Sequence, residues 1–145
     1  MTAASPRKLR LMAEDALDLK IISAAIQDSV AQVGDMRFDA GARQLVLMLN
    51  RYRWEAEGAG ERVRAALQVS GVMSVKAKRL RREPKEAVVS LLSMDFHCGD
   101  APGGRLDLTF AGGGELSCEV ECVDVMLADV SDPWPTPRRP SHDLD

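Results

Sequence analysis

The stretch over residues 105–122 constrains the fold most, because two alternating apolar segments flank three consecutive glycines, Gly112 to Gly114. Side chains on a strand point to opposite faces with a period of two, so each segment places one apolar row on one face. The rows are Leu106, Leu108 and Phe110, then Leu116, Cys118, Val120 and Cys122. Glycine adopts positive φ at little cost, which permits a tight turn. The pattern predicts a β-hairpin whose buried face the rest of the chain must cover.

Further alternating or apolar segments predict strands over residues 8–12, 43–55, 62–69, 72–80 and 87–98. The run from Leu45 to Leu49 is apolar on both faces, which is typical of a central strand covered on two sides. Met36 and Phe38 show the same period of two before a turn over residues 39–42. With the hairpin, these segments make about seven strands.

Residues 15–30 are predicted to form the one long helix, with Asp15 as its N-cap and Asp18 in its first turn. Its apolar residues cover a wide arc, which indicates deep packing against the sheet. They are Leu17, Leu19, Ile21, Ile22, Ala24, Ala25 and Ile26.

The end of the chain changes character twice. Val123, Met126, Leu127 and Val130 have helical spacing, which predicts a short helix that stops before Pro133. Residues 131–145 hold four prolines without apolar periodicity, so they are expected to be an extended or disordered tail. Trp134 in this tail has two interpretations: a recognition segment for a partner, or a plug for an apolar groove on its own domain.

The predicted fold class is α+β, in one domain over residues 1–130. An N-terminal helix packs on a mostly antiparallel sheet, or partly closed barrel, of about seven strands, and a short C-terminal helix follows. Seven antiparallel strands capped by a C-terminal helix is also the element order of pleckstrin-homology-like barrels, although fold analogy does not license function.

Composition and charge bear on the cellular location of the protein and on the kinds of partner it can have. No apolar run is long enough to span a membrane or to form a signal peptide, so a cytoplasmic location without membrane partners is expected. The cysteine count is odd, and the hairpin cysteines are interpreted as small buried hydrophobes. Residues 1–85 carry 16 basic and 10 acidic side chains, whereas residues 86–145 carry 3 and 12, a polarity that can steer a charged partner.

The candidate binding residues are mostly cations from one basic run. Such a cluster neutralises phosphates, and arginines on neighbouring strands, including Arg62 and Arg64, would extend it. The candidates are Lys76, Lys78, Arg79, Arg81, Arg82 and Lys85 in the run, with Arg51, Arg53 and the tail residue Trp134.

Catalytic and metal-binding motifs are not recognisable in the sequence. His97 and Cys98 are adjacent on a strand, so their side chains face opposite ways, and no Cys-x-x-Cys pair indicates zinc. The three glycines lie between two strands, whereas a phosphate loop leads into a helix. We therefore assign no catalytic residue, no metal ligand and no cofactor.

Three sequence segments resemble a known family. They are residues 49–55 (Leu-Asn-Arg-Tyr-Arg-Trp-Glu), the pair Gln27-Asp28 followed by Val33-Gly34-Asp35, and residues 110–114 followed by residues 119–122. Over nearly its whole length the chain is similar to an alphaproteobacterial family known only as a domain of unknown function, family 2948. The resemblance implies a small bacterial cytoplasmic protein. It implies no activity, cofactor or site residue.

The leading functional hypothesis is a non-enzymatic binding or adaptor module, with a protein partner or self-association. The first alternative is an RNA- or phosphate-binding protein that uses residues 76–85. The second alternative is an enzyme of unassigned class, for which no base, nucleophile and orienting group are apparent.

Overall fold

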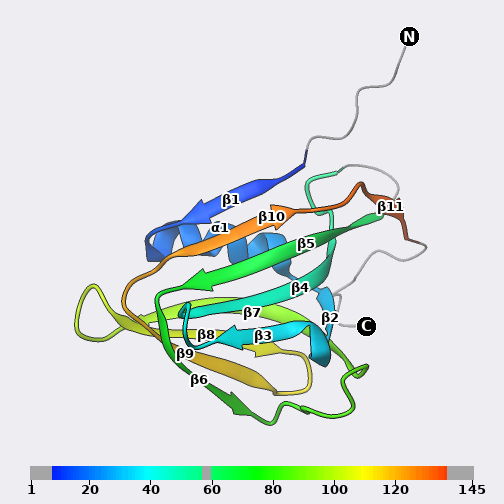
Figure 1. Ribbon diagram of the computed structural model, residues 1–145. Helices are drawn as coiled ribbons and strands as arrows, with labels where there is room; N and C mark the ends of the chain where they lie inside the picture. The colour runs from blue at the N-terminus through cyan, green and yellow to red at the C-terminus, as the bar shows by residue number, and fades with distance from the viewer. Residues whose placement is uncertain (1–7, 57–59, 137–145) are drawn as a thin grey trace.

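The structure is a computed structural model that describes residues 8–56 and 60–136 (Figure 1). In this part of the chain, eleven strands form one sheet accompanied by a single α-helix and one short 3-10 helix. The elements are β1 (Arg10–Ala13), α1 (Ala16–Ile26), β2 (Ser29–Gln32), η1 (Val33–Asp35), β3 (Met36–Asp39), β4 (Gln44–Tyr52), β5 (Glu61–Ser70), β6 (Val72–Lys78), β7 (Val88–Cys98), β8 (Gly104–Phe110), β9 (Glu115–Val120), β10 (Val125–Asp129) and β11 (Trp134–Pro135).

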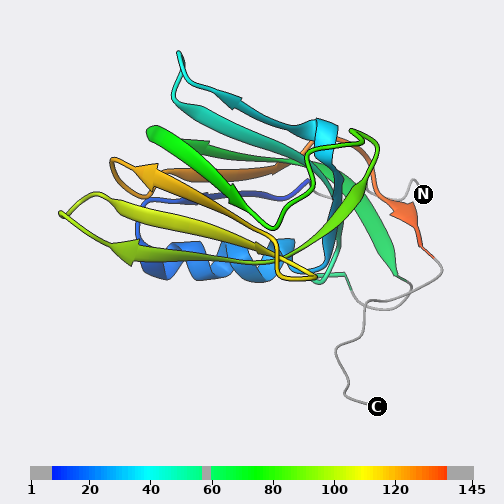
Figure 2. The same cartoon turned by 90° about the horizontal axis from the view of Figure 1, so that it is seen from below.

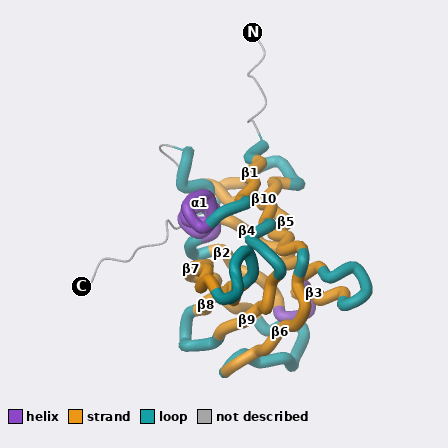
Figure 3. Tube along the Cα trace, turned by 90° about the vertical axis from the view of Figure 1, so that its left-hand side faces the viewer, coloured by secondary structure: helices purple, strands orange, loops and turns teal. Residues whose placement is uncertain are grey.

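The sheet is antiparallel throughout its described pairs and curls without closing. Its main path runs β1-β10-β5-β4-β2-β7-β8-β9-β6, while β3 pairs with β4 and β11 pairs with β5. Figure 2 shows α1 along one side of the sheet, and Figure 3 shows it between β1 and β7. In Figure 3 the curl also brings β6 close to β3, on the side away from the helix. The predicted antiparallel sheet with one early helix is thus confirmed.

The predicted hairpin is confirmed as β8 and β9. Leu106 pairs with Cys118 and Leu108 with Leu116, and all four side chains are buried. Gly112 and Gly113 have φ values of 88° and 92°, a region that favours glycine and lets the turn close. The apolar row of the hairpin is therefore part of the hydrophobic core.

Helix α1 begins as predicted but ends four residues earlier. The Asp15 side chain accepts a hydrogen bond from Asp18 N (2.7 Å), which caps the first turn. After Ile26 the chain turns through Asp28 at φ 63°, and Ser29 pairs with Leu91 of β7. Sheet pairing thus replaces the last helical turn.

Fewer apolar residues of α1 are buried than the sequence predicted. Leu19, Ile22 and Ile26 are buried, whereas Leu17 is 72% exposed and Ile21 is 57% exposed. The prediction that the whole wide arc packs deeply is wrong, because the sheet contacts only the i, i+3, i+7 stripe.

The predicted C-terminal helix over residues 123–130 is wrong, because β10 occupies residues 125–129 between β1 and β5. Val123, Val125, Leu127 and Asp129 are buried, which is a period of two hidden beneath the helical spacing. The pairing of both edges of β10 satisfies its backbone more completely than one short terminal helix would.

The predicted tail is partly attached to the sheet. Trp134 and Pro135 form β11 opposite Arg62 and Glu61, and Trp134 remains 37% exposed. Residues 137–145, which include most of the predicted tail, lie outside the described residues.

The count of about seven strands is too low, because β2, β3, β10 and β11 are additional to it. β10 lies where a helix was predicted, and β2 begins within the last two residues of the other predicted helix. The last described element is a strand, so the element order on which the comparison with pleckstrin-homology-like barrels rested is not observed.

Candidate functional site

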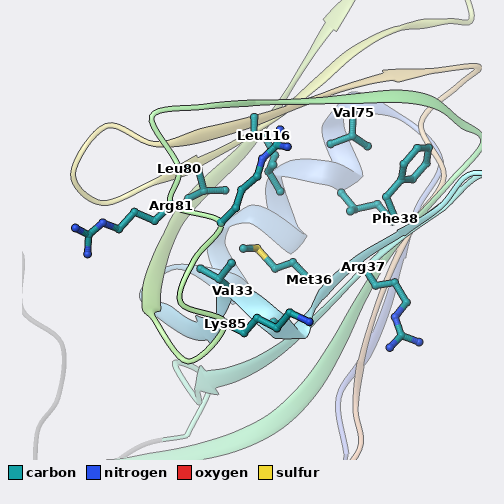
Figure 4. A pocket seen from close by; sticks show the side chains of 13 residues that line it. Val33, Met36, Arg37, Phe38, Val75, Leu80, Arg81, Lys85 and Leu116 are labelled. Atoms are coloured by element: carbon teal, nitrogen blue, oxygen red, sulfur yellow. The ribbon is translucent and has the colours of Figure 1, made fainter.

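A cavity of about 570 Å³ lies between β3 and β6. This volume lies within the range of ligand pockets, about 300–1,000 Å³. Figure 4 shows Val33, Met36, Leu80 and Leu116 directed into a common space. The apolar lining is Val33, Met36, Phe38, Leu45, Val75, Ala77, Leu80 and Leu116.

Backbone contacts hold the loop over residues 79–87 across one side of this cavity. Gly34 N donates to Lys85 O (2.8 Å), and Val33 N donates to Ala87 O (2.9 Å). A Cβ on Gly34 would lie 3.0 Å from Lys85 Cβ, and a Cβ on Gly114 would lie 3.0 Å from Arg79 O. The two glycines therefore permit the close approach that places the loop at the cavity.

Four cations surround the apolar lining, and we call them the cationic rim: Arg37, Arg81, Arg82 and Lys85. All four are exposed, and within the described residues none forms an ion pair. Among the described residues no carboxylate lines the cavity, although Glu83 and Glu86 lie on the same loop as three of the rim cations. The site therefore combines an apolar interior with exposed cations that form no ion pair in the described structure.

The basic run is divided by the geometry of β6. Val75 and Ala77 line the cavity, so Lys76 and Lys78 point to the opposite face of the strand. Arg79 follows the strand at φ 54°, a left-handed conformation in which the chain changes direction. Three of the six predicted cations of the run, Arg81, Arg82 and Lys85, reach the cavity.

Arg51 has a different place from the one expected. Its side chain is fully buried and makes five hydrogen bonds: to Asp129 from Nε (3.1 Å) and Nη2 (3.0 Å), to Glu55 from Nη1 (2.9 Å) and Nη2 (2.7 Å), and to Tyr52 O (3.3 Å). Burial alone would lower the pKa of Arg51, but the two carboxylates raise it. This corrects the predicted placement beside the basic run, because a buried guanidinium with every donor bonded offers nothing to a ligand.

The neighbouring arginines are also paired. Arg53 contacts Glu61 and Glu55, and Arg64 contacts Asp35 (3.1 Å) and Asn50 Oδ1 (3.1 Å). Arg62 donates to the backbone oxygens of Asp28 and Asn50. None of these arginines lines the cavity, so the predicted extension of the basic run along β4 and β5 is not formed.

Tyr52 and Trp54, the aromatic residues of segment 49–55, stabilise the fold and do not line the cavity. Trp54 Nε1 donates to Gln27 O (2.8 Å), which joins the end of β4 to the end of α1. The rings of Tyr52 and Trp54 meet edge to face, 4.7 Å apart. Trp134 pairs with Arg62 and is partly exposed, and it does not line the cavity.

The cysteines and His97 lie away from the cavity. Burial raises the pKa of the Cys118 thiol to about 12, which leaves it protonated at neutral pH. His97 faces Asp107 (3.3 Å), while Cys98 is exposed at the end of β7. Within residues 8–56 and 60–136, no group of three or more His, Cys, Asp and Glu side chains is arranged to hold a metal ion.

Several cavity residues were not predicted from the sequence. From the sequence, Met36 and Phe38 show only a period of two before a turn, and neither Arg37 nor Val33 is assigned a role. The available signal was a short amphipathic strand with a cation between two large apolar residues. Its significance depends on β6, which lies more than thirty residues away in the sequence.

The fold and cavity define a class: a curled antiparallel sheet with one covering helix and an apolar cavity rimmed by cations. A model of proteins of unknown function, DUF2948, matches residues 9–142. The chain therefore belongs to the DUF2948 family, as the resemblance predicted. No curated protein and no solved structure matches the chain. In the described part of the chain, no helix has the length and apolarity needed to cross a membrane.

Proposed function

We propose that this protein is a non-enzymatic binding module of the bacterial cytoplasm, and that its ligand is an anion with an apolar part bound in the cavity between β3 and β6. The observation that carries the proposal is the lining, in which the described residues supply eight apolar side chains and four exposed cations but no carboxylate. Apolar surface supplies affinity, and unpaired cations favour a negatively charged group at the mouth.

The same lining supports binding rather than catalysis. Among the described residues, its titratable side chains are arginines and a lysine, and it holds no Asp, Glu, His, Cys, Ser, Thr or Tyr. Of the groups that commonly serve in general acid-base and nucleophilic catalysis, the lining thus supplies only Lys85, which is exposed at the rim. A charged, apolar cavity of this composition is suited to holding a ligand unchanged.

The test uses 8-anilinonaphthalene-1-sulfonate, an apolar dye with one anionic group, in a fluorescence titration of the full chain. We expect the double variant Arg81→Gln/Arg82→Gln to bind the dye about tenfold more weakly, because each lost cation removes a charge-assisted contact. The matched control is Lys76→Gln/Lys78→Gln, which removes two cations from the opposite face of β6 and should leave the affinity unchanged. Equal affinity for both doubles and the parent would refute the proposal.

A filling substitution tests the apolar interior independently of charge. Ala77→Phe places a ring inside the cavity, whereas Met73→Phe places the same ring on an exposed site of the same strand. We expect only Ala77→Phe to abolish dye binding. Circular dichroism checks that both variants are folded, because the dye also binds partly unfolded protein.

The second candidate is binding of RNA or phosphate by the basic run. The observation that favours it is that Lys76, Lys78 and Arg79 are exposed and form no ion pair within the described residues. A single-stranded RNA oligonucleotide should then lose affinity steeply as salt rises. Both double variants should weaken RNA binding, whereas cavity binding depends on Arg81 and Arg82 alone.

A further inference from the structure

The cavity lies along the unpaired edge of β3. Met36, Arg37 and Phe38 are consecutive and all three line it. Met36 and Phe38 are half-buried on one face of β3, whereas Arg37 between them is exposed and points away from the apolar side chains (Figure 4). Among the described strands only β4 pairs with β3, so the other edge of β3 is free, and β6 lies close to β3 across the cavity (Figure 3).

The backbone at this edge is available for hydrogen bonding. Met36 N donates to Val33 O, whereas Arg37 and Phe38 form no backbone hydrogen bond in the described chain other than those that pair β3 with β4. Unpaired backbone groups at a strand edge are a template for an added strand. A small rigid anion would leave these groups unused.

The opposite wall suits the side chains of an added strand. Val75 and Ala77 of β6 present an apolar row to the cavity, and Leu80 continues it. β6 is the last strand on the main path of the sheet, and among the described strands only β9 pairs with it. A segment between β3 and β6 would bury alternate side chains against this row and turn the others toward solvent.

The charge of the rim indicates which segment fits. Arg81, Arg82 and Lys85 lie on the loop beside β6, and Arg37 extends from β3, where Figure 4 shows it directed away from the apolar side chains. Cations on both sides of the opening are complementary to carboxylates on the outward positions of a strand.

We propose that the cavity accepts an extended segment of a partner protein, in which apolar and acidic residues alternate, as a strand added to the free edge of β3. The inference rests on the proposed function, since it assigns the occupant of the same cavity. Backbone bonds to β3 supply affinity, and the apolar row and the cationic rim supply specificity.

The test is a fluorescence-anisotropy titration with a labelled peptide of about eight residues in which leucine and glutamate alternate. Two further peptides carry N-methyl groups on alternate backbone nitrogens, in the odd or the even positions. An added strand bonds to its neighbour through every second residue, so one methylated register should lose about tenfold or more in affinity and the other should bind nearly as well as the parent. Lysine in place of glutamate should also abolish binding.

The outcomes separate this inference from the proposed function. If both methylated registers bind like the parent peptide, or if the peptide does not bind while the sulfonate dye does, strand addition is refuted and the cavity remains a site for small amphipathic anions. If neither the peptide nor the dye binds, both proposals fail. The variant Arg81→Gln/Arg82→Gln should weaken peptide binding, and Lys76→Gln/Lys78→Gln should not.

Discussion

Basic side chains in two regions of this protein have opposite environments. At the end of β4, Arg51 is buried, and its donors are bonded to Asp129, Glu55 and a backbone oxygen. Along the cavity, the cationic rim is exposed and without ion pairs in the described structure. The difference teaches that the placement of carboxylates, rather than the number of cations, decides which region holds the fold together and which is open to a ligand.

The buried group depends on a carboxylate from a distant part of the chain. Asp129 stands at the end of β10, and its Oδ2 also accepts a hydrogen bond from Leu9 N (3.0 Å) beside β1. It therefore links the first strand, the central β4 and the last long strand. A buried charge is tolerable only when it is paired in this way.

The largest expected effect comes from breaking the buried pair. Asp129→Asn leaves the Arg51 guanidinium buried without its one buried carboxylate partner in the described structure, and we expect the free energy of unfolding to fall by about 3–5 kcal/mol. Urea unfolding followed by circular dichroism measures it. The matched control is Asp132→Asn, an exposed carboxylate near the same end of the chain, which should change stability by less than about 0.5 kcal/mol.

A double variant distinguishes an unpaired charge from a lost contact. Arg51→Met/Asp129→Leu removes both charges, and replacing a buried ion pair by apolar groups is often nearly neutral. We expect it to be more stable than Asp129→Asn. A double variant as unstable as the single variant would show that Asp129 acts mainly through its bond to Leu9.

The second effect tests how the cavity is positioned. Gly34→Ala places a methyl group 3.0 Å from Lys85 Cβ and 3.2 Å from Lys85 O, so the loop carrying the rim must shift. We expect a loss of about 1 kcal/mol in stability and a several-fold loss in affinity for the sulfonate dye. Gly41→Ala is the control, since its added methyl group meets only an Asp39 side-chain oxygen at 3.4 Å. Unchanged dye binding by Gly34→Ala would mean that the loop does not shape the cavity.

Much of the fold was predictable because its signals are local. The hairpin of β8 and β9, the N-cap at Asp15 and the alternation of β5 each depend on residues close in sequence. The segment 123–130 failed for the opposite reason. Its apolar residues satisfy both a helical and a strand period, and the choice was made by β1 and β5 on either side of β10.

The candidate site was predictable only in part for the same reason. Arg81, Arg82 and Lys85 were recognised as a charged run, yet Arg51 looked equivalent to them in the sequence. What distinguishes Arg51 is Asp129, 78 residues away along the chain. The apolar half of the cavity is likewise formed by β3 and β6, which no local pattern connects.

The third effect is a pH dependence of the stability that arises from the Arg51–Glu55 pair. Hydrogen bonds from Arg51 lower the pKa of Glu55 below its ordinary value of 4.5. Because the folded pKa is the lower one, this pair stabilises the protein above about pH 4.5, and the contribution is lost as the pH falls through the folded pKa. Glu55 is 41% exposed, so solvent screening keeps the effect within about 0–1 kcal/mol.

Thermal unfolding between neutral and acidic pH, compared with Glu55→Gln, isolates this contribution. The variant should be less stable than the parent at neutral pH, and the difference should shrink below pH 4.5. A difference that stays constant across this range would mean that Glu55 contributes by packing and not by charge.

The smallest expected effect completes the comparison. Arg81→Gln/Arg82→Gln should change the free energy of unfolding by less than about 0.5 kcal/mol, because exposed cations without partners contribute little to stability. Removal of like charges near Lys85 is expected to raise stability slightly if it changes at all. The same urea titration that detects the loss in Asp129→Asn measures it. A loss of more than about 1 kcal/mol would show that the two arginines hold the fold, and the contrast between paired and unpaired cations, together with the assignment of the rim to a ligand, would then have to be abandoned.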